Sequence, residues 1–381
     1  MTSAERSSRT QLGVLTAAKV VANTAMRWVG PFLPTLERAF GVSTSTLTSV
    51  MGLAELGGLT TAVTGHALDR GHRRRTFLGG LGLVAIASVI ALIGSIVAFA
   101  IGFVLVVIGV GHVTVAGHAW ISDRVPYRAR GRALGMFETA WALSLLFGAS
   151  GIAALIKAFG WRGPFVALAV GSALAILAEL AFVSPDRTTT HTETPPAGPI
   201  PASAWTTLAG SALIAASGLS VFVVSGAWLE DRHGMSTAGL GLVATGFGAM
   251  ELVASLSAAA FSDRVGLRRS VSIGLGVLAL GLAVAAGSGS SKVLAITGLI
   301  VFLTGFEFAF VTSLSLVTEA APLARGRAIG VGNALGTIAR SAAVLSSGLL
   351  YDGVGIGGSF GLSVVIAVLA GLLIAYGMTH V

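Results

Sequence analysis

The sequence predicts an all-α membrane protein with twelve transmembrane helices in two pseudo-symmetric six-helix bundles. Three observations carry this prediction: an apolar composition, twelve apolar segments of span length, and two loop motifs that recur at one offset. Of the 381 residues, 54% are hydrophobic and 10% are charged, and the mean hydropathy is +0.88. So few charged side chains cannot cover a water-facing surface, because soluble domains carry about 25% charged residues.

Twelve apolar segments reach the length of a membrane span, which needs about 20 residues to cross about 30 Å of hydrocarbon. In the first half of the chain they cover residues 11–35, 44–66, 76–96, 98–121, 131–156 and 163–183. In the second half they cover residues 204–229, 237–261, 270–289, 293–318, 327–350 and 357–378. Residues 184–203 are rich in Pro and Thr and lack apolar periodicity, which indicates a linker. We expect an N-terminal six-helix bundle over 1–183, this cytoplasmic linker, and a C-terminal six-helix bundle over 204–381.

The distribution of basic residues predicts which side of the membrane each loop occupies. Most of the 24 Lys and Arg residues lie in the N-terminal segment and in every second loop after it. Cytoplasmic loops carry such an excess, so both termini are expected in the cytoplasm, in a multi-pass protein of the cell (inner or plasma) membrane. The net charge of +8 then serves topology and contact with the lipid bilayer, and we expect no nucleic-acid partner.

Several classes of chemistry are excluded by patterns that the sequence lacks. It contains no cysteine, which rules out disulfides, thiolate metal sites and thiol catalysis. A phosphate-binding Gly-rich loop followed by Lys and Ser or Thr does not occur. Neither does a His-Glu-x-x-His run, or a Ser-His pair in the Gly-x-Ser setting of rhomboid-like enzymes. We expect no enzymatic activity, no metal and no cofactor, and we expect a monomer.

Two loop motifs recur at nearly the same offset and indicate a tandem duplication. GHALDRGHRRR at 65–75 follows the second span and AAFSDRVGLRRS at 259–270 follows the eighth, which places Asp69 and Asp263 194 residues apart. RARGRALG at 128–135 opens the fifth span and LARGRAIG at 323–330 opens the eleventh, which places Gly131 and Gly326 195 residues apart. Two independent motifs at one offset predict two six-helix units of the same topology.

With these motifs the chain resembles the major facilitator superfamily of secondary transporters, and within it the twelve-helix drug and metabolite exporters. The family's loop between helices 2 and 3 reads roughly Gly-x-Leu-Ala-Asp-Arg-x-Gly-Arg-Arg. The first copy departs from it at Ala67 and His72, and the second at Ala259 and Phe261. GWRGPF before the sixth span fits the exporter pattern, whereas an Arg in the fourth span and a Gly-Pro motif in the fifth are missing. The resemblance implies the major facilitator fold, with helices 1, 4, 7 and 10 facing a central cavity.

The charged loop residues form a candidate conformational latch on the cytoplasmic side. A carboxylate near helix ends accepts charge-assisted bonds from neighbouring Arg side chains and from an exposed helix N-terminus. Such a cluster is expected to tie helices 2, 3 and 5, or 8, 9 and 11, in one state and to loosen in another. The alternative is that the arginines only determine topology. The candidate latch residues are Gly65, Asp69, Arg70, Arg73, Arg74, Arg130, Asp263, Arg264, Arg268 and Arg325.

A polar stripe on the first span is the sharpest candidate for solute binding. Lys19, Asn23 and Arg27 are spaced by four residues, so they share one face of a helix. The resemblance places this helix on the central cavity, where its cations would recognise an anionic or polar group. The alternative is internal pairing, of Arg27 with Glu55 and of Lys19 with Glu138, because the members of each pair lie at similar depth. A pair that lines a cavity can also exchange partners during transport.

The repeat offset relates further polar residues. Adding 195 to His112 in the fourth span gives Glu307 in the tenth. Adding 195 to Glu138 in the fifth span gives Asn333 in the eleventh. We expect His112, Glu138 and Asn333 to contribute to solute binding.

Two aromatic side chains near these groups receive different interpretations. Trp141, three residues after Glu138, offers a flat surface to an aromatic or lipid-like solute, and packing in the core is the alternative. His118, nearer the cytoplasmic end of the fourth span, is expected to be an ordinary interface histidine.

Carboxylates inside the spans are the candidates for proton coupling. An ionisable group at mid-span costs at least about 2.5 kcal/mol on insertion scales and is a functional candidate by default. Glu307 is the first choice, because a carboxyl group in low dielectric holds its proton until water or a cation arrives. Arg340 and His112 are its candidate partners, Glu251 is the second choice, and Glu55 belongs to the same set. The alternative is a permanent Glu307–Arg340 pair that fastens helix 10 to helix 11.

Together these features predict a secondary active transporter that moves a small organic or amphipathic solute by alternating access. Proton-coupled efflux by antiport is the expected mode, with the proton gradient as the energy source, and the two halves would rock about a midplane site. An organic-anion importer or an anionic-lipid flippase of the same fold is the alternative, because the stripe on the first span is cationic. A non-transporting membrane sensor is a remote alternative.

Overall fold

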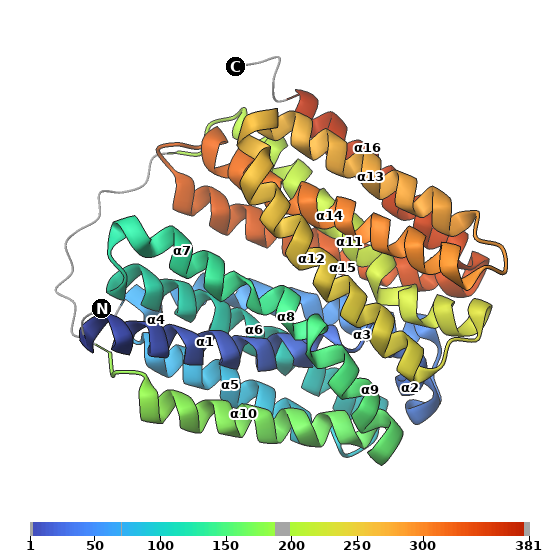
Figure 1. The fold of residues 1–381 in the computed structure, drawn as a ribbon, viewed down its shortest axis with the longest axis horizontal. Coiled ribbons are helices and arrows are strands. Elements are labelled where there is room, and N and C mark those ends of the chain that lie inside the picture. The colour runs from blue at the N-terminus through green and yellow to red at the C-terminus, as the bar shows by residue number, and fades with distance from the viewer. Residues whose placement is uncertain (1–2, 70, 187–198, 377–381) are drawn as a thin grey trace. The chain divides into compact units, whose positions relative to one another are not determined.

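Helices joined by short turns make up the described chain (Figure 1). The computed structural model describes residues 3–69, 71–186 and 199–376, and the side chains of 3–8, 65–67, 69, 127 and 325 lie outside the described part. Within these ranges no β-strand occurs. The predicted all-helical fold class is confirmed.

The first half of the chain forms helices α1 to α10. Their bounds are α1 Ser3–Arg27, α2 Leu33–Phe40, α3 Thr44–Glu55, the 3-10 helix η1 Leu56–Thr60, α4 Thr61–Asp69, α5 Arg73–Ala91, α6 Ile96–Arg124, α7 Tyr127–Glu138, α8 Ala140–Leu146, α9 Gly148–Phe159 and α10 Arg162–Phe182. The second predicted span is therefore broken into α3, η1 and α4. The fifth is broken into α7, α8 and α9.

The second half of the chain forms six long helices, one for each predicted span. Their bounds are α11 Ala204–His233, α12 Thr237–Val265, α13 Leu267–Ala286, α14 Lys292–Ala320, α15 Arg325–Val354 and α16 Ile356–Tyr376. Ser236 caps α12 and Ser291 caps α14, each accepting a hydrogen bond from a backbone N–H of the first turn. These caps explain why the helices begin where the apolar segments begin.

Ten helical stretches of the described residues are long and apolar enough to cross a membrane. They match predicted spans three to twelve in order. The first two predicted spans fall outside this set for physical reasons. Charged residues interrupt α1, and the second span is divided into segments of 12, 5 and 9 residues. With these two, the helices account for the twelve predicted spans.

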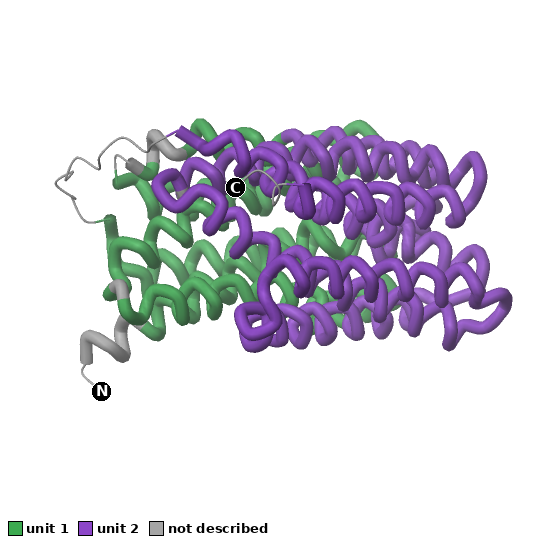
Figure 2. The backbone as a smooth tube through the Cα atoms, turned by 90° about the horizontal axis from the view of Figure 1, so that it is seen from above, with its two compact units in different colours: residues 1–29, 57–192 green, residues 30–56, 193–381 purple. Residues whose placement is uncertain are grey.

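Contacts divide the chain into two compact units (Figure 2). Unit 1 comprises residues 1–29 and 57–192, and unit 2 comprises residues 30–56 and 193–381. In unit 1, α1 packs against α6, α8 and α10, and α5 packs against α6. In unit 2, α11 packs against α14, α15 and α16, α13 packs against α14, and α3 packs against α15. The halves predicted from the duplication differ from these units in residues 30–56, which pack within unit 2.

Glycines with a left-handed backbone occur in pairs at the repeat offset. Such a conformation strains any residue that has a Cβ, so glycine occupies these turns. Eight glycines in the described ranges have a positive φ, and the members of each pair are 193 to 195 residues apart. The pairs are Gly41 with Gly234, Gly71 with Gly266, Gly94 with Gly289, and Gly160 with Gly355. The two halves therefore share their chain reversals, which supports the duplication independently of the loop motifs.

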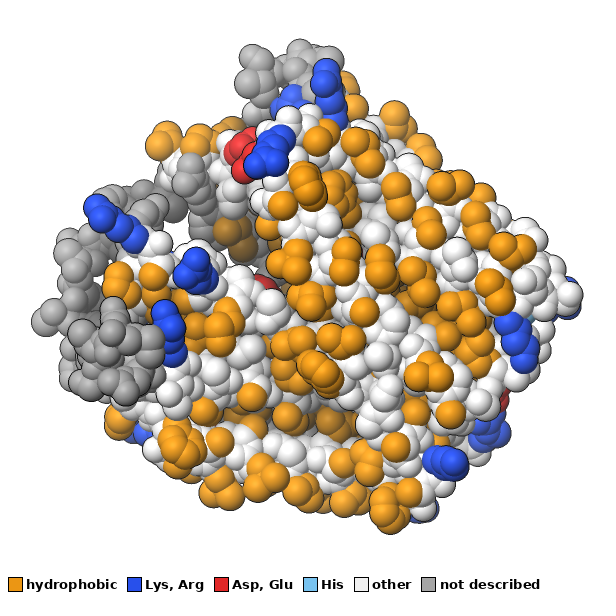
Figure 3. Space-filling model, viewed as in Figure 1, with side chains coloured by type: hydrophobic (Ala, Val, Ile, Leu, Met, Phe, Trp, Pro, Cys, Tyr) orange, Lys and Arg blue, Asp and Glu red, His pale blue; other side chains and the backbone are white. Residues whose placement is uncertain are grey.

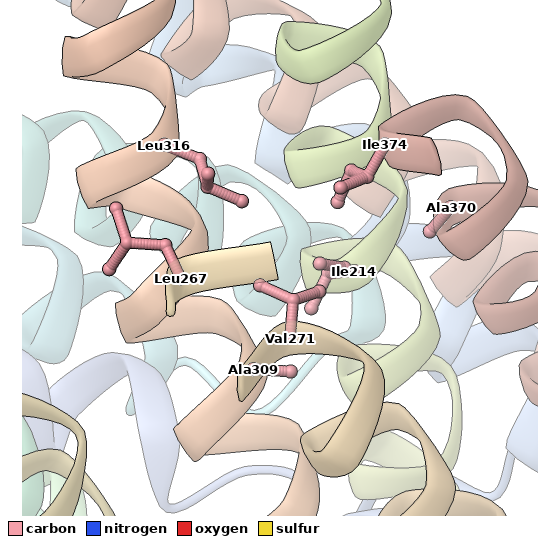
Figure 4. Packing of buried hydrophobic residues seen from close by; sticks show 7 residues of the cluster. All are labelled: Ile214, Leu267, Val271, Ala309, Leu316, Ala370 and Ile374. Carbon is pink, nitrogen blue, oxygen red and sulfur yellow. The ribbon is translucent and has the colours of Figure 1, made fainter. Parts of the chain in front are cut away.

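A hydrophobic cluster fills the space where four helices of unit 2 meet (Figure 4). Its buried members are Ile214 of α11, Leu267 and Val271 of α13, Ala309 and Leu316 of α14, and Ala370 and Ile374 of α16. Large apolar side chains also lie outside the core, among them Val63, Ile93 and Val293, each more than two-thirds exposed. Figure 3 shows apolar side chains spread over the helices and Lys and Arg toward the edges of the view. Such a surface requires lipid around it.

Candidate functional site

Three ionisable side chains form a cluster inside unit 1. Lys19 Nζ of α1 donates to Glu138 Oε1 of α7 over 2.7 Å, and His118 Nε2 of α6 lies 2.5 Å from the same oxygen. Lys19 is 2% exposed, whereas the Glu138 side chain is 49% exposed. The Lys19–Glu138–His118 cluster therefore neutralises a buried cation while about half of the Glu138 side-chain surface stays accessible. The Lys19–Glu138 pair is one that the sequence predicts, and it is confirmed.

Local packing explains why these side chains converge. α7 ends at Glu138 and α8 begins two residues later, so the carboxylate lies at an interruption of the fifth span. Phe137 is fully buried beside it, and Lys19 Nζ lies 4.3 Å from the centroid of its ring in a cation–π contact. The Phe137 ring lies against Gly117 of α6, where a Cβ would overlap it. A glycine at this position lets α7 approach α6 next to the histidine of the cluster.

The polar stripe of the first span lies on α1 in unit 1. Asn23, between the two cations, is fully buried, and neither atom of its amide has a hydrogen-bond partner among the described residues. Arg27 Nη1 donates to the Trp141 carbonyl over 2.7 Å, and the guanidinium lies 4.1 Å from the centroid of the Trp141 ring. A buried amide without a partner costs about 1–3 kcal/mol. Asn23 can therefore gain a hydrogen bond from a water or solute that enters beside it.

The Glu307–Arg340 pair that the sequence offers as an alternative is wrong. Arg340 of α15 instead donates to Glu55 of α3, with Nε and Oε2 3.0 Å apart. The physical reason is that residues 30–56 pack within unit 2, so the inner end of α3 faces α15. The Arg27–Glu55 pair joins residues of different units and stays a prediction.

The candidate coupling carboxylates of unit 2 are buried. Glu307 of α14 is 6% exposed and accepts a hydrogen bond of 2.7 Å from Ser255 of α12. Glu251 of α12 is 1% exposed. Asn333 of α15 is exposed. Glu307 and Glu251 are thus ionisable groups in the interior of spans, and their role in coupling stays a prediction.

His112 of α6 is held in one orientation within unit 1. Its Nδ1 lies 2.7 Å from the Ile108 carbonyl and its Nε2 lies 3.0 Å from Thr64 Oγ1 of α4. Because a carbonyl oxygen only accepts, Nδ1 carries a proton. His118 lies six residues further along the same helix, about 9 Å at 1.5 Å per residue. The predicted role of His112 in solute binding remains a prediction.

The first loop motif ties three helices of unit 1 together. Arg73 Nε lies 2.6 Å from Asp123 Oδ2 at the end of α6, and Arg74 Nε lies 3.1 Å from Glu179 Oε1 of α10. The backbone N–H of Arg74 also donates to Asp186. Glu179 is completely buried, so Arg74 neutralises a carboxylate that would be costly alone. These arginines join the third, fourth and sixth spans, and not the expected second, third and fifth.

The second loop motif lacks such contacts. Asp263, Arg264 and Arg268 are exposed and form no ion pair in the part of the chain that the structure describes. Of the other candidate latch residues, Arg130 is partly buried near the start of α7. Arg70 lies outside the described residues, and at Gly65, Asp69 and Arg325 only the backbone is described. The switching role of the latch therefore stays a prediction.

Three side chains that take part in these contacts are not predicted from the sequence. The expectation that His118 is an ordinary interface histidine is wrong, because His118 shares the oxygen of Glu138 with Lys19. Asp123 and Asp186 are likewise not predicted as partners of the loop arginines. The one available signal is that these acidic residues end spans on the predicted cytoplasmic side, where the arginines lie.

The sequence matches the family model described as Major Facilitator Superfamily over residues 15–230 and 207–379. The chain belongs to the major facilitator superfamily. The match agrees with the predicted superfamily, whose members are membrane transporters, and with the ten helical stretches of the described residues that are long and apolar enough to cross a membrane.

Solved structures of the superfamily share its fold. A bacterial homologue of the human lysosomal transporter Spinster, inward-facing and unoccupied, has a TM-score of 0.78 at 15% identity and covers 98% of this chain and 96% of its own. A D-xylose–proton symporter has a TM-score of 0.78 at 16% identity and covers 96% of each chain. At such identities the likeness concerns the fold alone.

A curated relative is the uncharacterised MFS-type transporter YwfA of Bacillus subtilis (strain 168). This major facilitator protein is 32% identical to it over 138 residues. The alignment covers 35% of this chain and 33% of the relative, about a third of its length.

Proposed function

We propose that this transporter exports a small organic or amphipathic solute in exchange for protons, by alternating access. The proton gradient is its energy source, and no cofactor takes part. The observation that carries the proposal is the Lys19–Glu138–His118 cluster, in which the half-exposed side chain of Glu138 neutralises the buried side chain of Lys19. The D-xylose–proton symporter, which has the same fold, supports proton coupling as a capacity of that fold.

The chemistry of the cluster links a proton to a solute. Both Lys19 and His118 contact Oε1 of Glu138, and no described residue bonds its Oε2. A proton or a cationic group of a solute that reaches Glu138 weakens its hold on Lys19. A buried ammonium group without a counter-charge is costly. Binding of one positive species at Glu138 therefore opposes binding of another, which is the requirement for antiport.

The buried carboxylates of unit 2 supply further proton sites in this proposal. Glu307 and Glu251 lie inside spans, where a charged carboxylate is expensive and protonation removes the cost. Glu55 and Arg340 belong to the same set and neutralise one another. His112, Trp141, Asn23 and Asn333 are proposed to contact the solute.

Transport in proteoliposomes with an imposed pH gradient tests the coupling. We expect Glu138→Gln and Glu307→Gln to lose the response of transport to the gradient. Glu319→Gln is the matched control, because Glu319 lies exposed on α14. Full retention of the gradient response in both Glu138→Gln and Glu307→Gln would refute proton coupling through these groups.

The cations of α1 favour a second candidate function. Lys19 and Arg27 are both buried on one face, with the amide of Asn23 between them. An organic-anion importer or an anionic-lipid flippase would use that face directly. Thermal stabilisation by cationic drugs, organic anions and lysolipids separates the candidates. Stabilisation by anions or lysolipids alone would favour the second function.

The membrane orientation and oligomeric state complete the proposal. The excess of basic residues in alternate loops supports a cytoplasmic position for both termini, in an inner or plasma membrane, and we propose that the transporter works as a monomer. Reporter fusions at each terminus test the orientation. Light scattering in detergent tests the oligomeric state, and a dimer mass would refute the monomer.

A further inference from the structure

A cleft at one end of unit 2 contains none of the groups proposed to couple protons or to contact the solute. Its volume is about 430 Å³, which lies within the range of about 300–1,000 Å³ found for small-molecule sites. It lies where α11 ends, between the turn that joins α13 to α14 and the turn that joins α15 to α16. This end of α11 is remote from the linker, so the distribution of basic residues predicts that the cleft is on the outer side of the membrane.

Two glycine turns and one fixed ring bound the cleft. Gly289 and Gly355 both line it and have φ of +56° and +76°. A Cβ at either position would meet no atom within 4 Å, so the space beside each turn is open. One wall is the ring of Trp228, which makes edge-to-face contacts with His233 at 5.0 Å and with Phe360 at 5.4 Å between ring centroids. Packing therefore holds this wall in place whether or not the cleft is filled.

The first half of the chain fills the equivalent space with its own side chains. Gly94 is the counterpart of Gly289 at the repeat offset. A Cβ at Gly94 would lie 3.3 Å from the Trp161 ring and 3.3 Å from Nη2 of Arg162. The Arg162 guanidinium lies 4.3 Å from the centroid of the Trp161 ring, in a cation–π contact. The space beside this turn thus holds an indole with a cation against it.

The second half lacks both of these side chains. At the same offset, Ile356 and Gly357 stand where the first half has its tryptophan and its arginine. The packing behind the space is kept, because Phe165 and its counterpart Phe360 each make an edge-to-face contact with a tryptophan near the end of the first helix of their half. The smaller residues therefore leave a space in which an aromatic group of a ligand can replace the missing indole.

Polar side chains of the cleft lack partners. Asp231 is exposed and accepts a hydrogen bond of 2.7 Å from the Tyr351 hydroxyl, but it forms no ion pair with a described residue. Arg232 is also exposed and pairs with no described carboxylate. These two cannot neutralise each other well, because consecutive residues of a helix do not face one another. Ser288 lines the cleft at 6% exposure, and no described residue bonds its hydroxyl group, which a ligand could therefore satisfy.

We propose that this cleft is a binding site for a small aromatic zwitterion, such as an aromatic amino acid. The ring of the ligand packs against Trp228, in the space that an indole fills in the first half. Its ammonium group binds the carboxylate of Asp231, and its carboxylate binds the planar guanidinium of Arg232. One ligand thereby neutralises both charges. The site is additional to the solute path, and the inference does not depend on proton coupling.

Fluorine NMR with L-tryptophan that carries fluorine on its ring measures this binding to the purified protein in detergent. We expect the signal to broaden beyond the effect of empty micelles, and unlabelled L-tryptophan to reverse the broadening. Tryptamine lacks the carboxylate and indole propionate lacks the ammonium group, so each should compete at least about tenfold more weakly. Absence of broadening by the parent protein, or equal competition by either analogue, would overturn the inference.

Variants of the two charged side chains locate the ligand. Asp231→Asn removes the charge and keeps an acceptor for the Tyr351 hydroxyl, and Arg232→Gln removes the guanidinium. Each should weaken binding about tenfold or more. Lys292→Gln is the matched control, because Lys292 is an exposed cation at the start of α14 that does not line the cleft. Equal effects of Lys292→Gln and Arg232→Gln would indicate attraction to general positive charge and contradict a site in the cleft.

A double variant rebuilds the side chains of the first half. Ile356→Trp with Gly357→Arg should fill the cleft and abolish binding, and a Cβ at Gly357 meets nothing within 4 Å that would oppose the change. A folded double variant that binds L-tryptophan as tightly as the parent would place the ligand elsewhere and overturn the inference. If the double variant does not fold, Asp231→Asn and Arg232→Gln decide the question. Since the cleft contains none of the groups tested for proton coupling, this inference and the proposed function fail separately.

Discussion

Lys19 and Glu138 are 119 residues apart in the chain, and their side chains meet at 2.7 Å inside unit 1. The Lys19 side chain is buried and the Glu138 side chain is half exposed. Glu138 is therefore accessible to water or solute, and it neutralises the charge of the buried Lys19. Because of this difference in exposure, a proton or a solute acts on the cluster through Glu138.

The first prediction concerns this pair. Glu138→Gln leaves the buried Lys19 charge with no carboxylate in the cluster, so it should lower the thermal midpoint more than Lys19→Met does. The double variant should recover most of the loss, with a coupling free energy of about 1–3 kcal/mol. Thermal unfolding of the four proteins in detergent measures the cycle. Strictly additive losses would contradict a direct pair.

The second prediction compares the two copies of the loop motif. Arg74→Gln leaves the buried carboxylate of Glu179 unneutralised, so it should destabilise unit 1 by about 3–5 kcal/mol. Arg268, its counterpart at the repeat offset of 194 residues, is exposed and unpaired in the described ranges, so Arg268→Gln should change stability by less than about 0.5 kcal/mol. Thermal unfolding of the two variants checks the difference. Equal effects would favour a purely topological role for both arginines.

The third prediction concerns the close packing of α3 against α15 within unit 2, where a Cβ at Gly52 would lie 2.9 Å from the Ser341 carbonyl oxygen. Gly52→Val places a branched side chain against that carbonyl and should destabilise the protein by about 1–3 kcal/mol. Gly361→Ala is the control, because nothing lies within 4 Å of a Cβ at Gly361 of α16. Thermal unfolding compares the two. A Gly52→Val protein as stable as the control would show that this packing does not depend on a small residue at position 52.

The fourth prediction is a pH dependence at Glu37. Burial raises the pKa of Glu37 above its ordinary value of 4.5, the hydrogen bond from Thr44 opposes the rise, and nearby carboxylates add to it. A carboxyl group with a raised pKa contributes stability below its ordinary pKa, and the contribution is lost as the pH rises through the raised value. Glu37→Gln should therefore raise the thermal midpoint at neutral pH and leave it unchanged near about pH 4. A variant less stable than the parent at neutral pH contradicts this sign.

Much of the fold follows from the sequence because it depends on local properties. Span length, the side on which basic residues gather, and the repeat offset are each set by residues close in the chain. The structure confirms the all-helical class and places a helix at each predicted span. The paired turns of Gly94 and Gly289, and of Gly160 and Gly355, show how far the duplication extends into the backbone.

The pairings could be predicted only in part, because they depend on the rotation of helices and on which helices become neighbours. Depth in the membrane identifies Lys19 and Glu138 as partners. Depth does not identify Arg340 as the partner of Glu55, because it does not reveal that α3 packs against α15. His118 joins the cluster because Gly117 admits the Phe137 ring, a contact that no periodicity encodes.

The Glu55–Arg340 pair has a consequence for how the protein is made. Its members are 285 residues apart, and ribosomes add about 5–20 residues per second. Glu55 thus reaches the translocon about 15–60 seconds before its counter-ion exists. During that interval an ionised Glu55 would cost about 2.5 kcal/mol or more in the bilayer. The Glu55–Arg340 pair therefore forms late in synthesis, and only the contacts of α16 and the end of α15 await residues made after Arg340.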